Sequence, residues 1–447
     1  MPFDHVTLAL LGEALRSLEG GFARLPEHAP RADLDALSRT LTETAQRLRD
    51  NYPYHHPLYV GQMLQPPHPV ARLAYALSMW LNPNNHALDG GRASSAMEKE
   101  AVAQIARMFG WQTHLGHLCG GGTVANLEAL WVSRELRPGR AVAASSQAHY
   151  THARLAALLA MPFREIPVDS IGRMDVDALE ATLAEGETGT VVATVGTTAA
   201  GAVDPLPEIL ALRERFAFRL HVDAAYGGYF VLADNLGPRT RRAFDRVGDV
   251  DSIVVDPHKH GLQPYGCGCV LFRDPAVGQF YKHDSQCTYF SSSELHLGEI
   301  SLECSRPGAA AVALWATLRL LPLTAGGEFA RGLSAGRGAA LMLYEALRQD
   351  ERFAPLLEPE LDIVVWAVRA PSAGESSARA RRLFEACAAR DLHLALARLP
   401  RVMAESAAPV ERWDEDELVC LRACVMKPEH RDWMPEILVR LSEAANA

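Results

Sequence analysis

A lysine stands between two histidines at the point where a short apolar run of the sequence ends. The run at 252–255 has the composition of a buried strand, and His258, Lys259 and His260 follow it after one Asp-Pro pair. A lysine at the end of a buried strand is costly as a purely structural residue, because burial disfavours its charged form. Burial and neighbouring cations favour the neutral amine, which is a nucleophile toward carbonyl groups. Lys259 is therefore the first candidate catalytic residue.

A carboxylate and an imidazole follow two other strand-like runs. Asp223 ends the run in HVDAAYGG, and the small Ala225 after it leaves room for a flat ring. A buried carboxylate without a partner is costly, so Asp223 should face a cation. His149, in SSQAHYTHAR, stands where a strand gives way to a helix, and its imidazole can stack on an aromatic ring or carry a proton. Each residue alone also fits a structural role, and we interpret His152 as a helix-face residue.

Glycines and threonines at further strand ends form a possible anion site. In GGGTVANLEALW, Gly121, Gly122 and Thr123 come directly before a helix, so backbone N–H groups and the helix N-terminus can approach a negative charge. The motif is neither a Walker loop nor a G-x-G-x-x-G fingerprint. Thr198, in TVGTTAAGAVDP, adds a hydroxyl at another strand end. Taken singly, both motifs also fit ordinary tight turns.

The elements that must position these residues form an alternating pattern. From about residue 115 to 320, short apolar runs alternate with helical stretches, which predicts an α/β fold with a mainly parallel sheet and helices on its faces. Sites in such folds lie beyond the carboxyl ends of the strands, where the candidate residues stand. The predicted parts are residues 1–88, a helical and loop segment; 89–322, a large sheet domain; and 323–447, a small α+β domain.

Composition excludes several other classes of protein. The 447 residues are 48% hydrophobic and 22% charged, which is typical of a globular protein with a large core. The net charge of −10 disfavours a nucleic-acid surface. A zinc site on Cys267, Cys269 and either His258 or His260 lacks a second ligand pair, so we expect no metal. The first residues lack a basic n-region and no apolar run reaches the roughly 20 residues of a membrane span, so we expect a cytoplasmic protein.

Together the candidate groups describe a site for pyridoxal 5'-phosphate (PLP). This cofactor needs a lysine amine for its aldehyde, a carboxylate for its ring nitrogen, a group that stacks on the ring and a cradle for its phosphate. Each component is a weak signal by itself. In this order, on successive strand ends, they are strong together.

The same motifs resemble those of the group II PLP-dependent decarboxylases, the family of aromatic L-amino acid, glutamate and histidine decarboxylases. The lysine of DPHKHG lies 36 residues after the aspartate of HVDAAYGG, with the glycine, histidine and threonine motifs upstream. The resemblance implies the aspartate-aminotransferase fold (fold type I), a homodimer with shared active sites, and an N-terminal segment that contributes to the dimer and the substrate pocket. It also implies decarboxylation of an L-amino acid to its amine and CO₂.

The resemblance implies roles for individual residues. Lys259 carries the internal aldimine, Asp223 pairs with the pyridine nitrogen so that a quinonoid intermediate can form, and His149 stacks on the ring and orients the substrate carboxylate. The implied cofactor-binding residues are Gly121, Gly122, Thr123, His149, Thr198, Asp223, Ala225, Asp256, His258 and Lys259.

A tyrosine on a mobile loop of the partner subunit protonates Cα in this family. Here Tyr289 is the candidate, with Tyr281 as its alternative, in a polar segment rich in serine. A phenylalanine at this position in related enzymes diverts the chemistry to oxidative deamination, and Phe290 is adjacent. A shift of one residue would therefore change the predicted reaction.

The substrate is less sharply indicated than the cofactor. His56, Gln62, Asn85 and Arg306 are the predicted substrate-binding residues, although Arg306 fits a structural salt bridge equally well. Aromatic and imidazole groups in the N-terminal segment slightly favour an aromatic amino acid over an acidic one. A carbon–carbon lyase of the sphingosine-phosphate lyase kind and a decarboxylating oxidase remain open. A binding module without catalysis is disfavoured, because the chain keeps all three catalytic groups.

Overall fold

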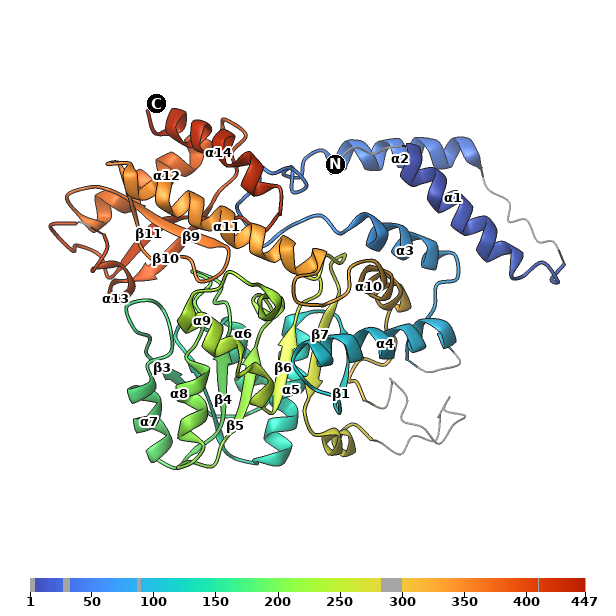
Figure 1. Cartoon of the computed structure of the whole chain (residues 1–447), viewed down its shortest axis with the longest axis horizontal. Helices are drawn as coiled ribbons and strands as arrows, with labels where there is room; N and C mark the ends of the chain where they lie inside the picture. Colours follow the sequence, from blue (N-terminus) through green and yellow to red (C-terminus); the bar gives the residue numbers. More distant parts are fainter. Residues whose placement is uncertain (1–4, 27–32, 87–89, 283–299, 409, 447) are drawn as a thin grey trace.

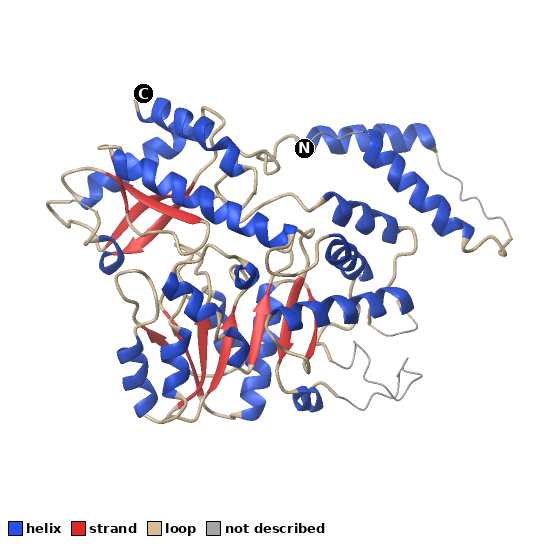
Figure 2. Cartoon of the chain, in the orientation of Figure 1, coloured by secondary structure: helices blue, strands red, loops and turns tan. Residues whose placement is uncertain are grey.

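The computed structural model describes residues 5–26, 33–86, 90–282, 300–408 and 410–446. The chain has a large part built on a seven-stranded sheet and a small part built on a four-stranded sheet (Figure 1). Helices flank both sheets (Figure 2). Within the described residues, no helix has the length and apolar character needed to cross a bilayer.

The large sheet has the strand order β1-β7-β6-β5-β4-β2-β3. Strands β6, β5, β4, β2 and β3 run parallel, and β7 is antiparallel to both of its neighbours. Strand β1 therefore runs in the same direction as the five, and the carboxyl ends of six strands meet at one edge. The strands are β1 (Leu115–Cys119), β2 (Ala141–Ser145), β3 (Phe163–Ile166), β4 (Thr188–Thr194), β5 (Arg219–Asp223), β6 (Ser252–Val255) and β7 (Gly268–Phe272).

The central strands are buried on both faces, which is why they appear in the sequence as continuous apolar runs. Val191 and Ala193 of β4 pack into the largest hydrophobic cluster, whereas Val192 points to the opposite face and packs with side chains of α5 and α6. The helices of the large part are α4 (Arg92–Met108), α5 (Gly122–Leu136), α6 (Thr151–Leu158), α7 (Val176–Ala184), α8 (Leu206–Leu212), α9 (Pro238–Phe244) and α10 (Gly308–Leu320), with 3-10 turns at Gly228–Leu232, Val247–Asp249 and Pro275–Phe280.

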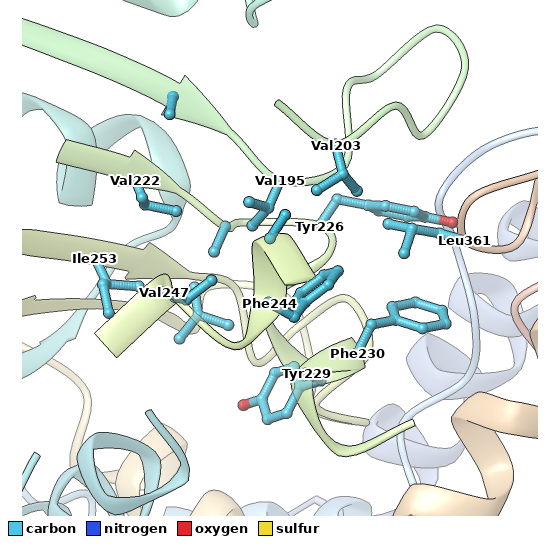
Figure 3. Close-up of a cluster of buried hydrophobic side chains, with 14 of the residues drawn as sticks. Val195, Val203, Val222, Tyr226, Tyr229, Phe230, Phe244, Val247, Ile253 and Leu361 are labelled. Atoms are coloured by element: carbon cyan, nitrogen blue, oxygen red, sulfur yellow. The ribbon is translucent and has the colours of Figure 1, made fainter. Parts of the chain in front are cut away.

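The largest hydrophobic cluster joins the two parts of the chain. Val222 of β5 and Ile253 of β6 lie on one side of it, and Tyr226 and Phe244 lie toward the other side (Figure 3). Leu361, which directly precedes the small sheet's strand β9, packs into the same cluster. The small part is therefore held against the edge of the large sheet where six strands end.

The small part contains an antiparallel sheet of order β10-β11-β9-β8. Its backbone also binds the N-terminal segment, because Val60 donates to the carbonyl of His393 (2.9 Å) and accepts from the N–H of Cys424 (2.7 Å). Its elements are α11 (Glu328–Gln349), β8 (Phe353–Pro355), β9 (Ile363–Val368), α12 (Ala373–Ala388), β10 (Ala395–Pro400), α13 (Arg401–Ala404), β11 (Glu417–Cys424) and α14 (His430–Ala445).

Two N-terminal helices lie at the periphery of the chain, where α1 contacts α3. Helices α1 (His5–Gly20) and α2 (Leu34–Leu48) have no buried residue, and Figure 1 shows them in blue beyond α3 (Pro69–Met79). Proline opens α3 because its fixed φ suits the first helical turn. The predicted combination of a mainly parallel α/β sheet, an N-terminal helical segment and a small α+β part is confirmed.

Candidate active site

A cavity of about 290 Å³ opens at the edge where the strands of the large sheet end. Every residue predicted to bind the cofactor lines it, which follows from the parallel topology because successive strand ends meet there. The lining residues are Gly120, Gly121, Gly122, Thr123, Val124, Asn126, His149, Thr151, Thr194, Gly196, Thr198, Asp223, Ala225, Tyr226, Asp256, His258 and Lys259.

The glycines between β1 and α5 form a cradle that larger residues would fill. Gly121 has a φ of +145°, and a Cβ built there would lie 3.2 Å from Cε1 of His258. A Cβ on Gly122 would lie 2.8 Å from Oδ2 of Asp256. The bare backbone ahead of α5 thus leaves room for an anion at a helix N-terminus, where N–H groups and the helix dipole favour negative charge. This cradle fits a phosphate group.

Asp223, at the end of β5, is a buried carboxylate with donors on both oxygens. Oδ1 accepts from the backbone N–H of Ala225 (3.1 Å), and Oδ2 lies 2.9 Å from Nε2 of His152 and 3.4 Å from Nδ2 of Asn126. Burial by itself would raise the pKa of Asp223, but the His152 hydrogen bond, the His152 and Lys259 charges and the Ala225 N–H outweigh it and hold the pKa well below its ordinary value. The carboxylate is therefore ionised at neutral pH and suits a protonated ring nitrogen.

Lys259 points its amine into the same cavity. Its Nζ lies 3.0 Å from Oδ2 of Asp256, and its side chain is 21% exposed, so the amine is both held and reachable. Gln65, from the N-terminal segment, donates its amide N–H to the carbonyl of Lys259 (2.8 Å). The lysine is thus fixed at its backbone and at its amine.

The two histidines beside Lys259 face opposite ways. His258 lines the cavity and stacks on Tyr265, with ring centroids 4.7 Å apart, and burial is the main cause of its lowered pKa. His260 points to the small part, where its Nε2 lies 2.8 Å from Oδ2 of Asp362. One neighbour of the lysine therefore belongs to the cavity, and the other anchors the lysine's loop to the small part.

His149 lies in the loop before α6 and is half-buried at the cavity wall. Its Nδ1 accepts from the backbone N–H of Thr151 (3.3 Å), which fixes the ring. Burial lowers the pKa of His149, and the nearby Asp223 partly opposes that shift. The ring is therefore mainly neutral at neutral pH and is suited to stacking on a flat heterocycle.

The predicted substrate-binding residues do not reach the cavity. Asn85 and Arg306 are buried together around Glu98, with Arg306 Nη1 2.7 Å from Oε1 of Glu98 and Asn85 Nδ2 2.6 Å from its Oε2. Arg306 is thus a structural ion-pair residue, which was the alternative interpretation of it. His56 stacks on Trp433 of α14, with ring centroids 4.8 Å apart. Gln62 is solvent-exposed and does not line the cavity.

Of the two candidate proton donors, only Tyr281 lies among the described residues. Tyr289 lies outside the described residues, so its role stays a prediction. Tyr281 is 5% exposed and packs in a hydrophobic cluster, with its ring centroid 4.9 Å from that of Trp131. Tyr281 is therefore a core residue and does not suit a mobile loop.

His152 and Asn126 are site residues that the sequence interpretation missed. His152 was taken as a helix-face residue, but its side chain is fully buried against Asp223. A signal was present, since His152, Leu155, Ala156 and Leu159 are spaced as one buried stripe of a helix. A polar residue on such a stripe needs a buried polar partner, and an inward-pointing histidine near a strand end is thereby marked as a site residue.

The fold and the site define a PLP-dependent enzyme of fold type I. A family model described as the pyridoxal-dependent decarboxylase conserved domain matches residues 127–369, more than half of the chain, and the chain belongs to this family. The cofactor-binding groups in the cavity fit PLP in number and in chemistry. The protein is therefore a PLP-dependent amino acid decarboxylase, which confirms the predicted family, enzyme class and cofactor.

Relatives and solved structures agree with this assignment. The L-tyrosine decarboxylase of Enterococcus faecium is 29% identical, with 76% of this chain and 73% of that protein covered. A probable L-aspartate decarboxylase of Halobacterium salinarum is 35% identical over 48% of this chain and 59% of that protein. The structure of Oryza sativa TDC with PLP and tryptamine has a TM-score of 0.78 at 19% identity and covers both chains fully, and mouse CSAD in apo form has 0.78 at 22%, covering 96% and 91%. These structures show the fold.

Proposed function

We propose that the enzyme decarboxylates an aromatic L-amino acid to its amine, with Lys259 as the residue that attaches PLP. The observation that carries the site assignment is that the Lys259 amine and the ionised Asp223 carboxylate line one cavity together with the glycine cradle and His149.

The roles of the residues follow from their contacts. When bound, PLP supplies a ring that takes up the electron pair released as a bond to Cα breaks. Asp223 holds a proton at the ring nitrogen because its carboxylate stays ionised. Asp256 forms an ion pair with the Lys259 amine and steadies it for attachment. His149 stacks on the ring and orients the substrate carboxylate, which decides which bond breaks.

An aromatic substrate is supported by tyrosines next to His258 and in the N-terminal segment, although these tyrosines do not line the cavity themselves. Tyr265 stacks on His258 and is 57% exposed, and its hydroxyl donates to the carbonyl of Met63 (3.3 Å). Tyr54 and Tyr59 from the same N-terminal segment stack edge to face, with centroids 4.9 Å apart. Among the described residues that line the cavity there is no arginine, the group best suited to a second carboxylate. Relatives named as tyrosine decarboxylases point the same way.

We propose a homodimer because apolar side chains are exposed on the N-terminal helices. Leu34, Leu37, Leu41 and Leu48 of α2 are each at least half exposed and recur along one side of the helix. An apolar stripe of this kind, on a helix without buried residues, needs a covering surface. We propose that a second copy of the chain supplies it and that residues 1–88 contribute to this contact and to the substrate pocket.

A reducing compartment is proposed from the cysteines. All seven cysteines of the described part are free thiols, and six of them are buried. Chains in oxidising compartments more often pair their cysteines. We therefore retain the cytoplasm as the proposed location.

The test measures all products at once. Purified enzyme with PLP is incubated with tyrosine, tryptophan, dihydroxyphenylalanine, aspartate, glutamate and 2,4-diaminobutyrate, and CO₂, amine, aldehyde and peroxide are quantified. We expect CO₂ and amine in equal amounts from an aromatic substrate, and borohydride to fix the cofactor on Lys259. Preferred turnover of an acidic or a basic amino acid would refute the substrate class, and aldehyde with peroxide would refute the reaction.

The matched variant is Lys259→Ala. We expect at least a thousandfold loss of turnover and no cofactor retained after borohydride treatment, because the attaching amine is gone. Full activity in this variant would overturn the assignment of Lys259.

A further inference from the structure

Asp223 belongs to a buried polar network that spans the four elements α5, α6, β5 and β6. His152 Nε2 lies 2.9 Å from Asp223 Oδ2, and both side chains are almost completely buried. Asn126 bridges the same oxygen to His221, whose Nε2 lies 2.8 Å from Oδ1 of Asn126. The polar network continues to Ser252, whose Oγ lies 2.9 Å from Nδ1 of His221. In the described part of the protein, His152 and Asn126 are the only residues whose side chains form hydrogen bonds with this carboxylate.

We propose that His152 is a positioning residue that orients the Asp223 carboxylate toward the nitrogen of the PLP ring. This inference rests on the proposed role of Asp223. A residue on the outer face of a helix would reach solvent. The His152 ring is instead fully buried, and its one hydrogen bond is to this carboxylate.

The direction of the His152 hydrogen bond follows from its partner. An ionised carboxylate only accepts, so Nε2 carries a proton and donates it to Oδ2. Nδ1 has no hydrogen-bond partner among the described residues, so the bond to Asp223 is the one that fixes the ring.

The donors leave the carboxylate only one free direction. Ala225 N–H occupies Oδ1, and His152 and Asn126 occupy Oδ2 from the side of α6 and α5. The remaining acceptor positions face the cavity that Asp223 lines. Loss of the His152 donor would let the carboxylate turn and would weaken its hold on the ring nitrogen.

The electrostatic surroundings of Asp223 determine how this loss depends on pH. The titratable groups coupled to Asp223 are His152 on α6, Lys259 in the loop after β6, His149 before α6 and His221 on β5. Burial lowers the pKa of His221 to about 3, so His221 stays neutral. Without His152, burial would raise the pKa of Asp223, so the defect should be larger at pH 6 than at pH 8.

The test uses three substitutions at His152 and one control. His152→Gln keeps an amide donor, His152→Asn is too short to reach, and His152→Leu removes the donor. Leu155→Ala, on the same buried stripe of α6, is the control for packing. The measured quantities are the dissociation constant of PLP from the full-length enzyme and the pH dependence of the visible absorption band of bound PLP.

We expect the PLP dissociation constant to rise at least tenfold in His152→Leu, as for loss of a hydrogen bond to a charged group, and to rise about threefold or less in His152→Gln. Leu155→Ala should leave the constant and the band unchanged while lowering the melting temperature. If His152→Leu does not fold, a difference between His152→Gln and His152→Asn in the same two measurements carries the test.

The experiment distinguishes failure of the proposed function from failure of the role proposed for His152. Wild-type enzyme that holds no PLP on Lys259 would refute the proposed function. Wild-type enzyme that holds PLP normally, with His152→Leu or His152→Asn matching it in affinity and in the pH dependence of the band, would overturn the role of His152 alone.

Discussion

Replacing Asp362 by alanine and by asparagine should have very different effects, because of how His260 is bonded. Asp362 is 1% exposed, accepts from the hydroxyl of Tyr226 (2.6 Å) through Oδ1, and lies 2.8 Å from His260 Nε2 through Oδ2. The other nitrogen of His260 lies 2.9 Å from the carbonyl of Tyr226. Both ring nitrogens therefore lie within hydrogen-bond distance of oxygen atoms, and the buried Asp362 carboxylate holds both the His260 ring and the Tyr226 hydroxyl.

The magnitudes follow from what each substitution leaves behind. Asp362→Ala leaves the Tyr226 hydroxyl and the His260 Nε2–H buried without partners, so we expect it to lower the free energy of unfolding by about 3–5 kcal/mol. In Asp362→Asn the amide oxygen still accepts from Tyr226, and the amide N–H can donate to Nε2 of His260 while Nδ1 donates to the carbonyl of Tyr226. The buried hydrogen-bonding groups thus keep their partners, and we expect a change within about 1 kcal/mol.

The assay is urea unfolding of both variants beside the wild type, together with the PLP content of each purified protein. PLP content should fall in Asp362→Ala, because His260 directly follows Lys259 and Tyr226 lines the cavity. Glu375→Ala, which removes an exposed pair with Arg379, is the control and should cost no more than about 0.5 kcal/mol. Equal losses in Asp362→Asn and Asp362→Ala would refute the hydrogen-bonding role of the Asp362 side chain.

Three further predictions concern the cavity. Gly121→Ala puts a side chain at a φ of +145° and against His258, so PLP affinity should fall about tenfold or more, measured by equilibrium dialysis, and an unchanged affinity would argue against the cradle. Tyr289→Phe should replace amine by aldehyde and peroxide in the product assay, whereas unchanged products would exclude Tyr289 as the proton donor. The lowered pKa of Asp223 stabilises the folded state above its ordinary value near 4 and is lost as the pH falls through the folded pKa. The difference in unfolding free energy between wild-type apoenzyme and Asp223→Asn should therefore be constant above about pH 5 and shrink at lower pH, and a difference that grew on acidification would contradict the sign of the shift.

The sequence indicates where a residue lies when its position on one element decides its place. Lys259, Asp223 and His149 each stand at the end of a strand-like run, and parallel strands bring their ends to one edge, where all three line the cavity. The sequence could not choose between roles where several distant segments compete for a polar side chain. Arg306 fitted a substrate site and a salt bridge equally well, and its guanidinium is paired with Glu98 on α4, a contact between residues 208 positions apart.

The sequence by itself determined the class of chemistry, because the order of a glycine motif, a histidine, an aspartate and a lysine along alternating strands and helices is visible without coordinates. Only the tertiary structure decided which polar groups support that chemistry. Asp362 lies 102 positions from His260 in the chain, and the direction of the His152 ring depends on how α6 packs over β5. Such contacts are made by whichever donor and acceptor the folded core brings together, and local sequence pattern carries no information about that pairing.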